Sequence, residues 1–192
     1  ITSWSEWERS EPRGDEIFHL VTHLSHADTG DEEERVALLK GVGKEMLDSV
    51  HGGGRKATAL HFAALEGNVP AVRLLIGAGA SADISVSGRS PLHIACGKGH
   101  AETTRTLLSA GAKVASKTSS GRTALVCAAG RGSLATVKVI LDAIFRLEQN
   151  AGNDSQAAEA RALLDACQAD SGRTALSIAA EEGHDEIVAE LV

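Results

Sequence analysis

The phrase T-A-L-H-F-A-A-L-E-G, which begins at Thr58 and ends at Gly67, decides the fold of this chain because three close copies of it follow. The copies begin at Ser90, Thr123 and Thr174, in steps of 32, 33 and 51 residues. They read S-P-L-H-I-A-C-G-K-G, T-A-L-V-C-A-A-G-R-G and T-A-L-S-I-A-A-E-E-G. A period near 33 residues is typical of stacked-repeat proteins, in which neighbouring repeats bury one another's apolar faces. Such proteins act mostly by presenting a surface.

Each phrase carries the signals of a short helix. Its opening Thr or Ser has a hydroxyl that can accept a hydrogen bond from a free backbone N–H at a helix start, and Pro91 suits the first helical position. Its closing glycine takes the left-handed backbone that ends a helix. A second apolar run follows, as at residues 72–76 and 106–108, and ends near Gly79 or Gly111. One repeat is therefore predicted to be a helical hairpin with a connecting turn.

The phrase resembles that of the ankyrin repeat, which is close to G-x-T-P-L-H-x-A-A-x-x-G, and the second copy matches it best. The resemblance covers roughly residues 55–142 and 168–192. It implies an all-α ankyrin-repeat solenoid of stacked helical hairpins with β-turn loops. We expect one repeat domain over residues 52–192, with about four repeats at about 53–84, 85–117, 118–168 and 169–192.

Three departures from the family phrase predict local differences. Val126 and Ser177 replace the family's His in the third and fourth copies, so no turn-to-helix hydrogen bond through that residue is expected there. Lys56 replaces the glycine that precedes the other copies, which predicts an irregular leading turn.

An insertion at about 143–167 interrupts the rhythm of the repeats. Residues 143–147 are predicted to prolong the second helix of repeat three, and residues 150–153 to form a turn. Asp154 is then the expected cap of an added helix that runs to about Ala166. Such an insertion projects from one face of the stack.

The residues before the repeats divide into two regions. Residues 1–14 hold both tryptophans, Trp4 and Trp7, in a polar strip that is either a docking segment or a flexible end. Residues 15–51 contain two amphipathic patterns, which predict a helical cap over the open end of the stack. The acidic stretch 28–34 leaves an alternative, in which this region covers the basic repeats and competes with a partner.

Composition narrows the class of protein. The chain has 192 residues with 43% hydrophobic content, enough for one elongated domain with a continuous core. We find neither an apolar run of about 18 residues nor the apolar segment of a secretion signal; the sequence begins with Ile1 rather than Met, which is compatible with further chain upstream. Three cysteines make no disulfide framework, and Cys96 and Cys127 occupy apolar positions expected to be buried. We therefore expect a cytoplasmic protein, with the nucleus as the alternative location.

The sign of the charge changes along the chain. Residues 1–51 hold 12 acidic and 5 basic side chains, residues 52–138 hold 3 and 11, and residues 139–192 hold 11 and 3. These regions of like charge are either ordinary solvated faces or the source of an electrostatic field that steers an oppositely charged partner.

The resemblance implies that the hairpin tips and the exposed side of the first helices line a concave recognition surface. At the matching positions, repeats two and three contribute Arg89, Lys98, Arg122 and Arg131. Arginine forks suit carboxylates, so we expect another protein to dock an acidic segment against these two repeats. The partner-binding candidates are Leu65, Glu66, Val86, Ser87, Arg89, Lys98, Ser119, Ser120, Arg122, Arg131, Asp170, Arg173, Glu181 and Glu182, with Gly97, Gly130 and Ser171 at further matched positions.

Catalytic and cofactor patterns are weak. Two G-x-G-x-x-A runs, at residues 77–82 and 130–135, follow predicted helices rather than the strand that a dinucleotide site requires. The H-G-G-G run at residues 51–54 looks like an oxyanion loop, but no G-x-S-x-G motif supplies a nucleophile. Four residues could in principle bind zinc, namely His19, His23, His26 and Asp28, but neither cysteine ligands nor a second cluster of histidines accompanies them.

Nucleic acid is a further possible partner of the basic centre. The chain holds only two Trp, three Phe and no Tyr, and none interleaves with the arginines as a stacking platform requires. The net charge of −7 also repels phosphate backbones. We therefore expect a non-enzymatic interaction module without metal, cofactor, membrane or small-molecule site. The alternative is the targeting or regulatory part of a larger enzyme.

Overall fold

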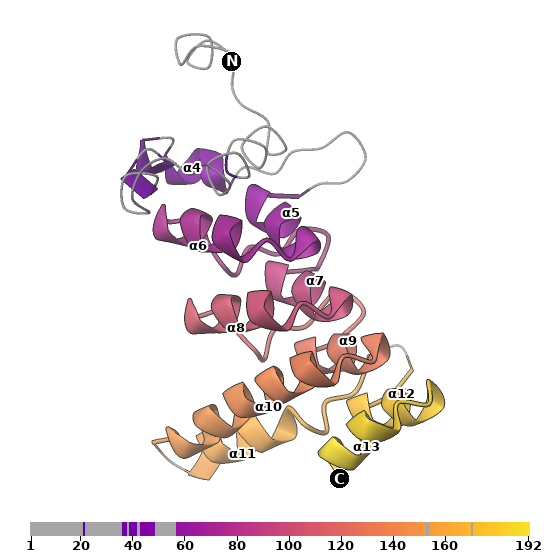
Figure 1. Cartoon of the computed structure of the whole chain (residues 1–192). Helices are drawn as coiled ribbons and strands as arrows, with labels where there is room; N and C mark the ends of the chain where they lie inside the picture. The colour runs from indigo at the N-terminus through magenta and orange to yellow at the C-terminus, as the bar shows by residue number, and fades with distance from the viewer. Residues whose placement is uncertain are drawn as a thin grey trace.

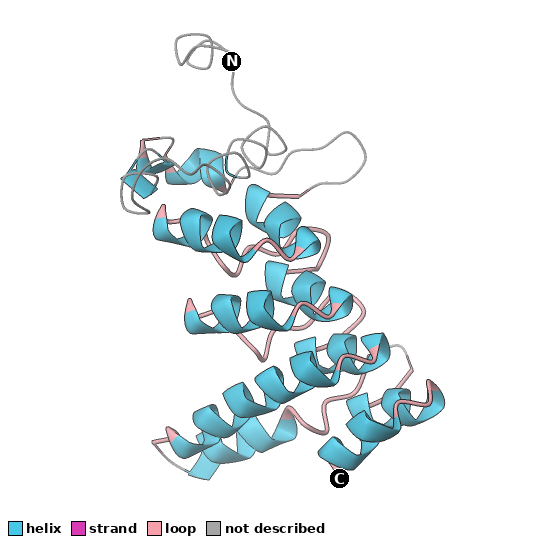
Figure 2. Ribbon diagram, in the orientation of Figure 1, coloured by secondary structure: helices cyan, strands magenta, loops and turns pink. Residues whose placement is uncertain are grey.

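The computed structural model describes residues 21, 36–37, 39–41, 43–48, 57–152, 154–169 and 171–192. In this part of the chain, pairs of helices stack in one direction from the first repeat to the C-terminus (Figure 1). Loops join the helices, and the only β-type pairings among these residues are two isolated bridges, Val86 with Arg89 and Lys117 with Thr123 (Figure 2). The predicted all-α repeat solenoid is confirmed.

Four helix pairs make up the four repeats. In each pair the first helix holds the repeated phrase and the second runs back beside it. The pairs are α5 (Ala59–Glu66) with α6 (Val69–Gly77), α7 (Pro91–Lys98) with α8 (Ala101–Ser109), α9 (Ala124–Arg131) with α10 (Leu134–Gln149), and α12 (Ala175–Glu181) with α13 (Asp185–Leu191). The short helix α4 (Lys44–Leu47) precedes them, and α11 (Asp154–Ala162) follows α10.

At the start of each first helix, the Thr or Ser hydroxyl makes one of two kinds of hydrogen bond. In repeats three and four, Thr123 Oγ1 and Thr174 Oγ1 accept from the backbone N–H three residues on, at 3.3 and 3.2 Å. In repeat one, Nδ1 of His61 faces the Thr58 N–H at 3.3 Å and so carries no proton, and the Thr58 hydroxyl donates to it at 2.8 Å. The second repeat has the same arrangement. The helix starts therefore lie at the predicted residues, with an imidazole as the hydroxyl's partner in the first two.

These two histidines also connect consecutive repeats. Because Nδ1 accepts, the proton of the neutral ring lies on Nε2, which is then a donor. Nε2 of His61 donates to the backbone oxygen of Arg89, and Nε2 of His93 to that of Ser116, each at 3.0 Å. Each bond ties a buried ring of one repeat to the chain that leads into the next helix pair.

Repeats three and four lack this connection, as their substitutions predict. Val126 has no polar atom in its side chain, and Ser177 Oγ donates to the Thr174 oxygen of its own turn at 3.0 Å. A histidine of the repeated phrase therefore links consecutive repeats in the first half of the stack only.

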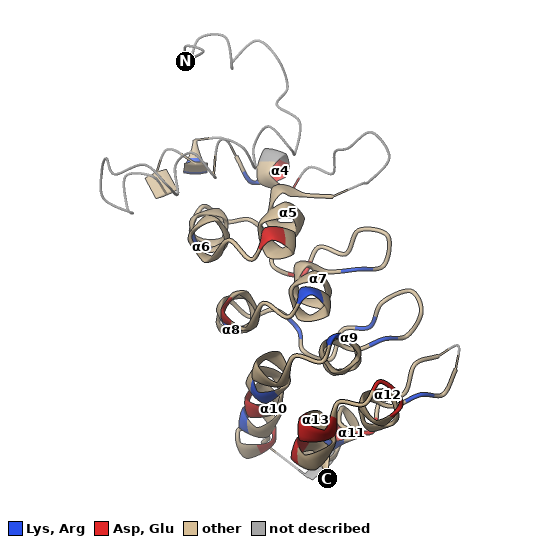
Figure 3. Ribbon diagram, turned by 45° about the vertical axis from the view of Figure 1, so that its right-hand side comes forward, with Lys and Arg blue, Asp and Glu red and all other residues tan. Residues whose placement is uncertain are grey.

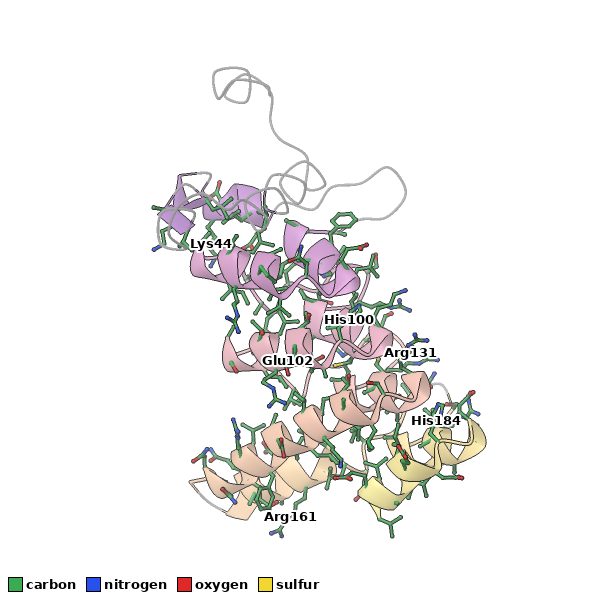
Figure 4. All side chains as sticks on the ribbon, in the orientation of Figure 1. Lys44, His100, Glu102, Arg131, Arg161 and His184 are labelled. Atoms are coloured by element: carbon green, nitrogen blue, oxygen red, sulfur yellow. The ribbon has the colours of Figure 1, made fainter. Side chains whose placement is uncertain are left out.

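A second row of contacts joins the starts of the second helices. His100, the residue before α8, lies against Gly67 and donates from Nε2 to the Leu65 oxygen at 3.1 Å. His184, the residue before α13, lies against Gly132. A Cβ on Gly67 or Gly132 would come within 2.8 or 2.5 Å of the facing ring, so close packing requires glycine at both. Both histidines lie on the same side of the molecule (Figure 4).

The insertion lengthens repeat three and adds one helix. The α10 helix runs to Gln149, well past the ends of α6 and α8, and α11 packs along it (Figure 1). The Glu148 carboxylate accepts from Arg161 Nε at 2.6 Å and holds the two together. The added helix ends at Ala162 rather than near Ala166, because Leu163 and the next residue bond three residues back and tighten the chain into a turn.

Burial follows position in the repeat until the last copy. Leu60, Leu92 and Leu125 are the third residues of the first three phrases and are at most 2% exposed. Leu176 holds the same place in the fourth phrase and is 37% exposed. The difference arises because no further repeat within the described residues covers α12.

The described residues ahead of repeat one lie against it. Val21, Leu39 and Leu47 are buried in the same apolar core as the repeats, and the Asp48 carboxylate accepts from the Ser81 N–H at 2.8 Å. These contacts cover the open side of the first repeat. Much of the two expected helices lies outside the described residues, as do Trp4, Trp7, the acidic stretch 28–34 and Lys56.

Candidate interaction groove

An open groove of about 1250 Å³ runs along the stack. One wall is made by the turns that precede α7, α9 and α12, at residues 86–89, 118–122 and 168–173, which we call the fingers. The other wall is made by the first helices of all four repeats. Figure 3 shows the fingers projecting from the helix stack on one side.

Most of the partner-binding candidates line this groove. Eleven of the 14 do so, namely Leu65, Val86, Ser87, Arg89, Lys98, Ser119, Ser120, Arg122, Arg131, Arg173 and Glu182. Glu66 and Glu181 are exposed outside the lining. Asp170 lies outside the described residues. Gly97 and Gly130 also line the groove.

Four residues form the floor of the groove, and of these only Cys127 was singled out from the sequence, as a position expected to be buried. Phe62, Ile94, Cys127 and Ile178 occupy the same place in the four phrases and all line the groove. They lie three residues before the predicted positions of Leu65 and its equivalents, so they share a helix face with them. This three-residue spacing is the sequence signal from which the floor residues could have been predicted. The other lining residues that the sequence analysis did not name as candidates are Ala57, His61, His93, Thr118, Val126 and Gln168.

The cations of the groove form two rows at repeats two and three. Arg89 and Arg122 come from the fingers, and we call them the finger row. Lys98 and Arg131 come from the last residues of α7 and α9, and we call them the helix row. All four side chains are exposed, and among the described residues no acidic group forms an ion pair with any of them. Within the described part of the chain, these four charges have no counter-ion.

The fourth repeat ends the basic region. Arg173 follows Arg89 and Arg122 in the fingers, but its guanidinium is paired with the Glu181 carboxylate. Glu182 lines the groove at the place that Lys98 and Arg131 hold in their repeats. In Figure 3 the first helices change from basic residues in α7 and α9 to acidic residues in α12.

The fingers lengthen from repeat to repeat. The residues enclosed by the hydrogen-bonded pair number two, three and four in turn, for the pairs Val86 with Arg89, Thr118 with Arg122, and Gln168 with Arg173. In the shortest finger Ser87 and Gly88 have φ of +53° and +74°, the left-handed pair that a two-residue hairpin turn requires.

Neighbouring fingers pack against one another. A Cβ on Gly88 would lie 2.6 Å from Ser119, and a Cβ on Gly121 would lie 2.5 Å from Ala169. The Ala169 N–H also donates to the Ser120 oxygen at 3.2 Å. The finger wall is thus continuous across repeats two to four.

Two histidines of the lining are neutral. Burial lowers the pKa of both His61 and His93, and their hydrogen bonds to backbone oxygens oppose the shift. Neutral rings agree with the single proton on Nε2 inferred from the hydrogen bonds.

The thiols near the floor are protonated. Cys96 is buried as expected, and burial raises its pKa to about 12. Cys127 is only half-buried because it faces the groove; burial still raises its pKa, against the opposing charges of Arg122 and Arg89. Neither thiol is activated as a nucleophile.

The described part of the chain has neither a metal site nor a membrane-spanning helix. It contains no group of three or more His, Cys, Asp and Glu side chains placed to hold a metal, and none of its helices is both long and apolar enough to cross a membrane. The candidate zinc ligands His19, His23, His26 and Asp28 and the H-G-G-G run lie outside these residues. Gly79 and Gly132 follow helix ends with φ of +101° and +75°, as helix stops do.

A family model described as ankyrin repeats matches the chain in three copies, over residues 23–118, 60–154 and 111–192. Protein phosphatase 1 regulatory subunit 27 of Mus musculus is 40% identical over 95 residues, and the Homo sapiens protein of the same name is 39% identical. Each match spans 48% of this chain and 58% of the relative. The E3 ubiquitin-protein ligase KEG of Arabidopsis thaliana is 35% identical over 88 residues, 45% of this chain and 5% of the ligase.

Proposed function

This chain belongs to the ankyrin-repeat family, and from that membership we propose that it is a non-catalytic interaction module that binds an acidic segment of another protein in its groove. The segment lies opposite repeats two and three. The observation that carries the proposal is the pair of basic rows, Arg89 with Arg122 and Lys98 with Arg131, none of which has an acidic partner among the described residues.

The chemistry of the rows favours carboxylates. Three of the four cations are arginines, whose planar forks bind a carboxylate through two parallel hydrogen bonds. Clustered charge of one sign also raises the association rate of an oppositely charged partner. Binding is therefore sensitive to salt, since the Debye length is about 8 Å at physiological ionic strength.

Nucleic acid and small molecules fit the groove less well. Among the described residues of the lining, Phe62 is the only Phe, Tyr or Trp, so they offer no stacking platform for successive bases. The groove is open rather than enclosed, whereas small-molecule sites bury most of their ligand.

A second candidate function comes from the relatives. They are named as a phosphatase regulatory subunit and a ubiquitin ligase. This chain can accordingly be the regulatory or targeting part of a larger enzyme or enzyme complex, whose catalytic domain lies outside residues 1–192. Recovery of phosphatase or ligase activity with the affinity-purified chain would favour this function.

We place the protein in the cytoplasm, with the nucleus as the alternative. The thiols Cys96, Cys127 and Cys167 are all free, as suits a reducing compartment. Fluorescence microscopy of the tagged protein in its native cell tests the location, and signal confined to the secretory pathway would contradict it.

The test of the proposed function is charge reversal in the groove. Arg122→Glu combined with Arg131→Glu should remove most partner binding in affinity purification from the native cell. The matched control reverses Arg105 and Lys113, which lie outside the groove lining and face Glu102 and Asp83. It changes the net charge equally and should leave binding intact. Equal binding by all three proteins would show that the groove is not the recognition surface.

A further inference from the structure

Gly97 and Gly130 lie in the groove, and nothing in the described part of the chain requires glycine at either position. Each is the next-to-last residue of its helix, in α7 and α9, and neither has a left-handed backbone. A Cβ on Gly97 would meet no atom within 4 Å, and one on Gly130 would meet only Ile178 Cγ2, at an ordinary 3.4 Å. Since glycine destabilises a helix relative to alanine, a benefit outside the fold is indicated.

The two glycines lie in the same two repeats as the basic rows. Gly97 and Gly130 are the eighth residues of their phrases, where the first and fourth phrases have Leu65 and Glu181. The helix surface is therefore bare only in repeats two and three. Each glycine directly precedes a cation of the helix row, Lys98 or Arg131. Bare backbone beside unpaired cations allows an acidic partner to approach closely.

We propose that the acidic segment binds in an extended conformation, with its main chain lying directly on Gly97 and Gly130, between the finger row and the helix row. The inference rests on the proposed function and adds to it the conformation and position of the partner.

The dimensions of the stack favour an extended segment over a helix. Packed helices lie about 8–10 Å apart, and an extended chain advances about 3.3 Å per residue. One repeat therefore corresponds to about three residues of the partner. Side chains of an extended segment alternate in direction, so carboxylates from one segment reach both rows. A helical partner about 10 Å across would keep its main chain away from the glycines, and the missing Cβ atoms would bring no gain.

The two ends of the groove limit the position of the segment. At repeat one the wall is apolar, with Phe62 and Leu65. At repeat four Arg173 is already paired with Glu181 and adds little attraction. The acidic side chains should therefore lie centrally, and an apolar side chain should lie at the end that faces repeat one.

The experiment uses peptides of about 12 residues, long enough to span the four repeats in extended form. They are selected from a random phage-displayed library panned on the intact chain. Binding of the selected peptides is measured by fluorescence polarisation against Gly97→Ala, Gly130→Ala and the double variant. The control is Gly152→Ala, because Gly152 has room for a Cβ, no left-handed backbone and no place in the groove lining. Arg122→Glu with Arg131→Glu tests the proposed function in parallel.

The expected peptides are rich in Asp and Glu. Each groove Gly→Ala change should weaken them about tenfold, since one methyl group in a closely packed contact is poorly tolerated. The same changes should raise the melting temperature by roughly 2 °C, because alanine favours the helix. Gly152→Ala should not alter binding.

The outcomes distinguish a failure of the close approach at the glycines from a failure of the proposed function. If the glycine variants bind the peptides as tightly as the original chain while the charge reversal abolishes binding, the close approach is wrong and the proposed function stands. If the glycine variants lower the melting temperature, the fold itself needs these glycines and the inference fails. If no acidic peptides are selected, or the charge reversal leaves binding unchanged, the proposed function fails as well.

Discussion

Nε2 of His61 donates a hydrogen bond to the backbone oxygen of Arg89 at 3.0 Å, so a buried ring of repeat one holds the finger that carries a cation of the groove. The ring is almost completely buried, and its other nitrogen faces the Thr58 hydroxyl at 2.8 Å. One imidazole therefore joins a helix start, the next repeat and the recognition surface.

Replacing this ring should destabilise the stack. His61→Val puts in the residue type that repeat three uses at this position. It removes the imidazole bond to the Arg89 oxygen, which keeps only the Val86 N–H, and it leaves the Thr58 N–H without its acceptor. We expect a loss of roughly 1–3 kcal/mol in the free energy of unfolding, measured by urea denaturation. Ser177→Ala, which removes two bonds within a single turn and none between repeats, should cost less. Equal losses in the two variants would show that the link between repeats contributes nothing.

The stability of the protein should depend on pH through His61 and His93. Burial lowers both pKa values below the ordinary 6.5, so between that value and the lowered one the unfolded chain binds more protons than the folded chain. Their contribution is complete above pH 6.5 and is lost as the pH falls through this window. Each ring contributes about 1.4 kcal/mol for every unit by which its pKa is lowered.

Urea denaturation across this pH range tests the prediction. The double variant His61→Gln with His93→Gln should show a flatter pH profile, because Gln does not titrate. A profile with the same slope as that of the original chain would assign the pH dependence to other groups.

The glycines that face histidine rings should tolerate alanine worse than other left-handed glycines. At Gly67 an added Cβ meets the His100 ring at 2.8 Å, and moving that ring breaks its bond to the Leu65 oxygen. At Gly111, with φ of +89°, a Cβ meets nothing. Gly111→Ala should therefore cost about 1–2 kcal/mol for the backbone alone, and Gly67→Ala clearly more. Thermal unfolding compares them, and equal melting temperatures would contradict the contact.

Removal of residues 1–50 separates the two roles considered for the N-terminal region. Val21, Leu39 and Leu47 are buried with the repeat core, and each large buried side chain contributes roughly 1.5–3 kcal/mol. Truncation should therefore lower the melting temperature and expose the apolar side of repeat one. An unchanged melting temperature together with tighter binding of the groove partner would instead identify the region as a competitor.

Much of the groove could be predicted from the phrases because their variable positions recur at fixed offsets. Arg89, Arg122 and Arg131 were assigned to one surface in this way, and they line one groove. The floor was harder to predict. Phe62 and Ile94 have the apolar character of core residues, and their spacing of three residues from Leu65 and Gly97 is the sequence signal that they face the groove.

The sequence by itself determined the helices of the four repeats and their ends, because hydroxyl caps, glycine stops and apolar spacing act within about ten residues of chain. Tertiary structure alone decided where equivalent positions of the repeats differ in burial and pairing. Leu176 is exposed although its three equivalents are buried, and Arg173 is neutralised by Glu181 although Arg122 is not. Both outcomes depend on which groups lie next to a side chain in space. The sequence of a repeated phrase does not specify those groups.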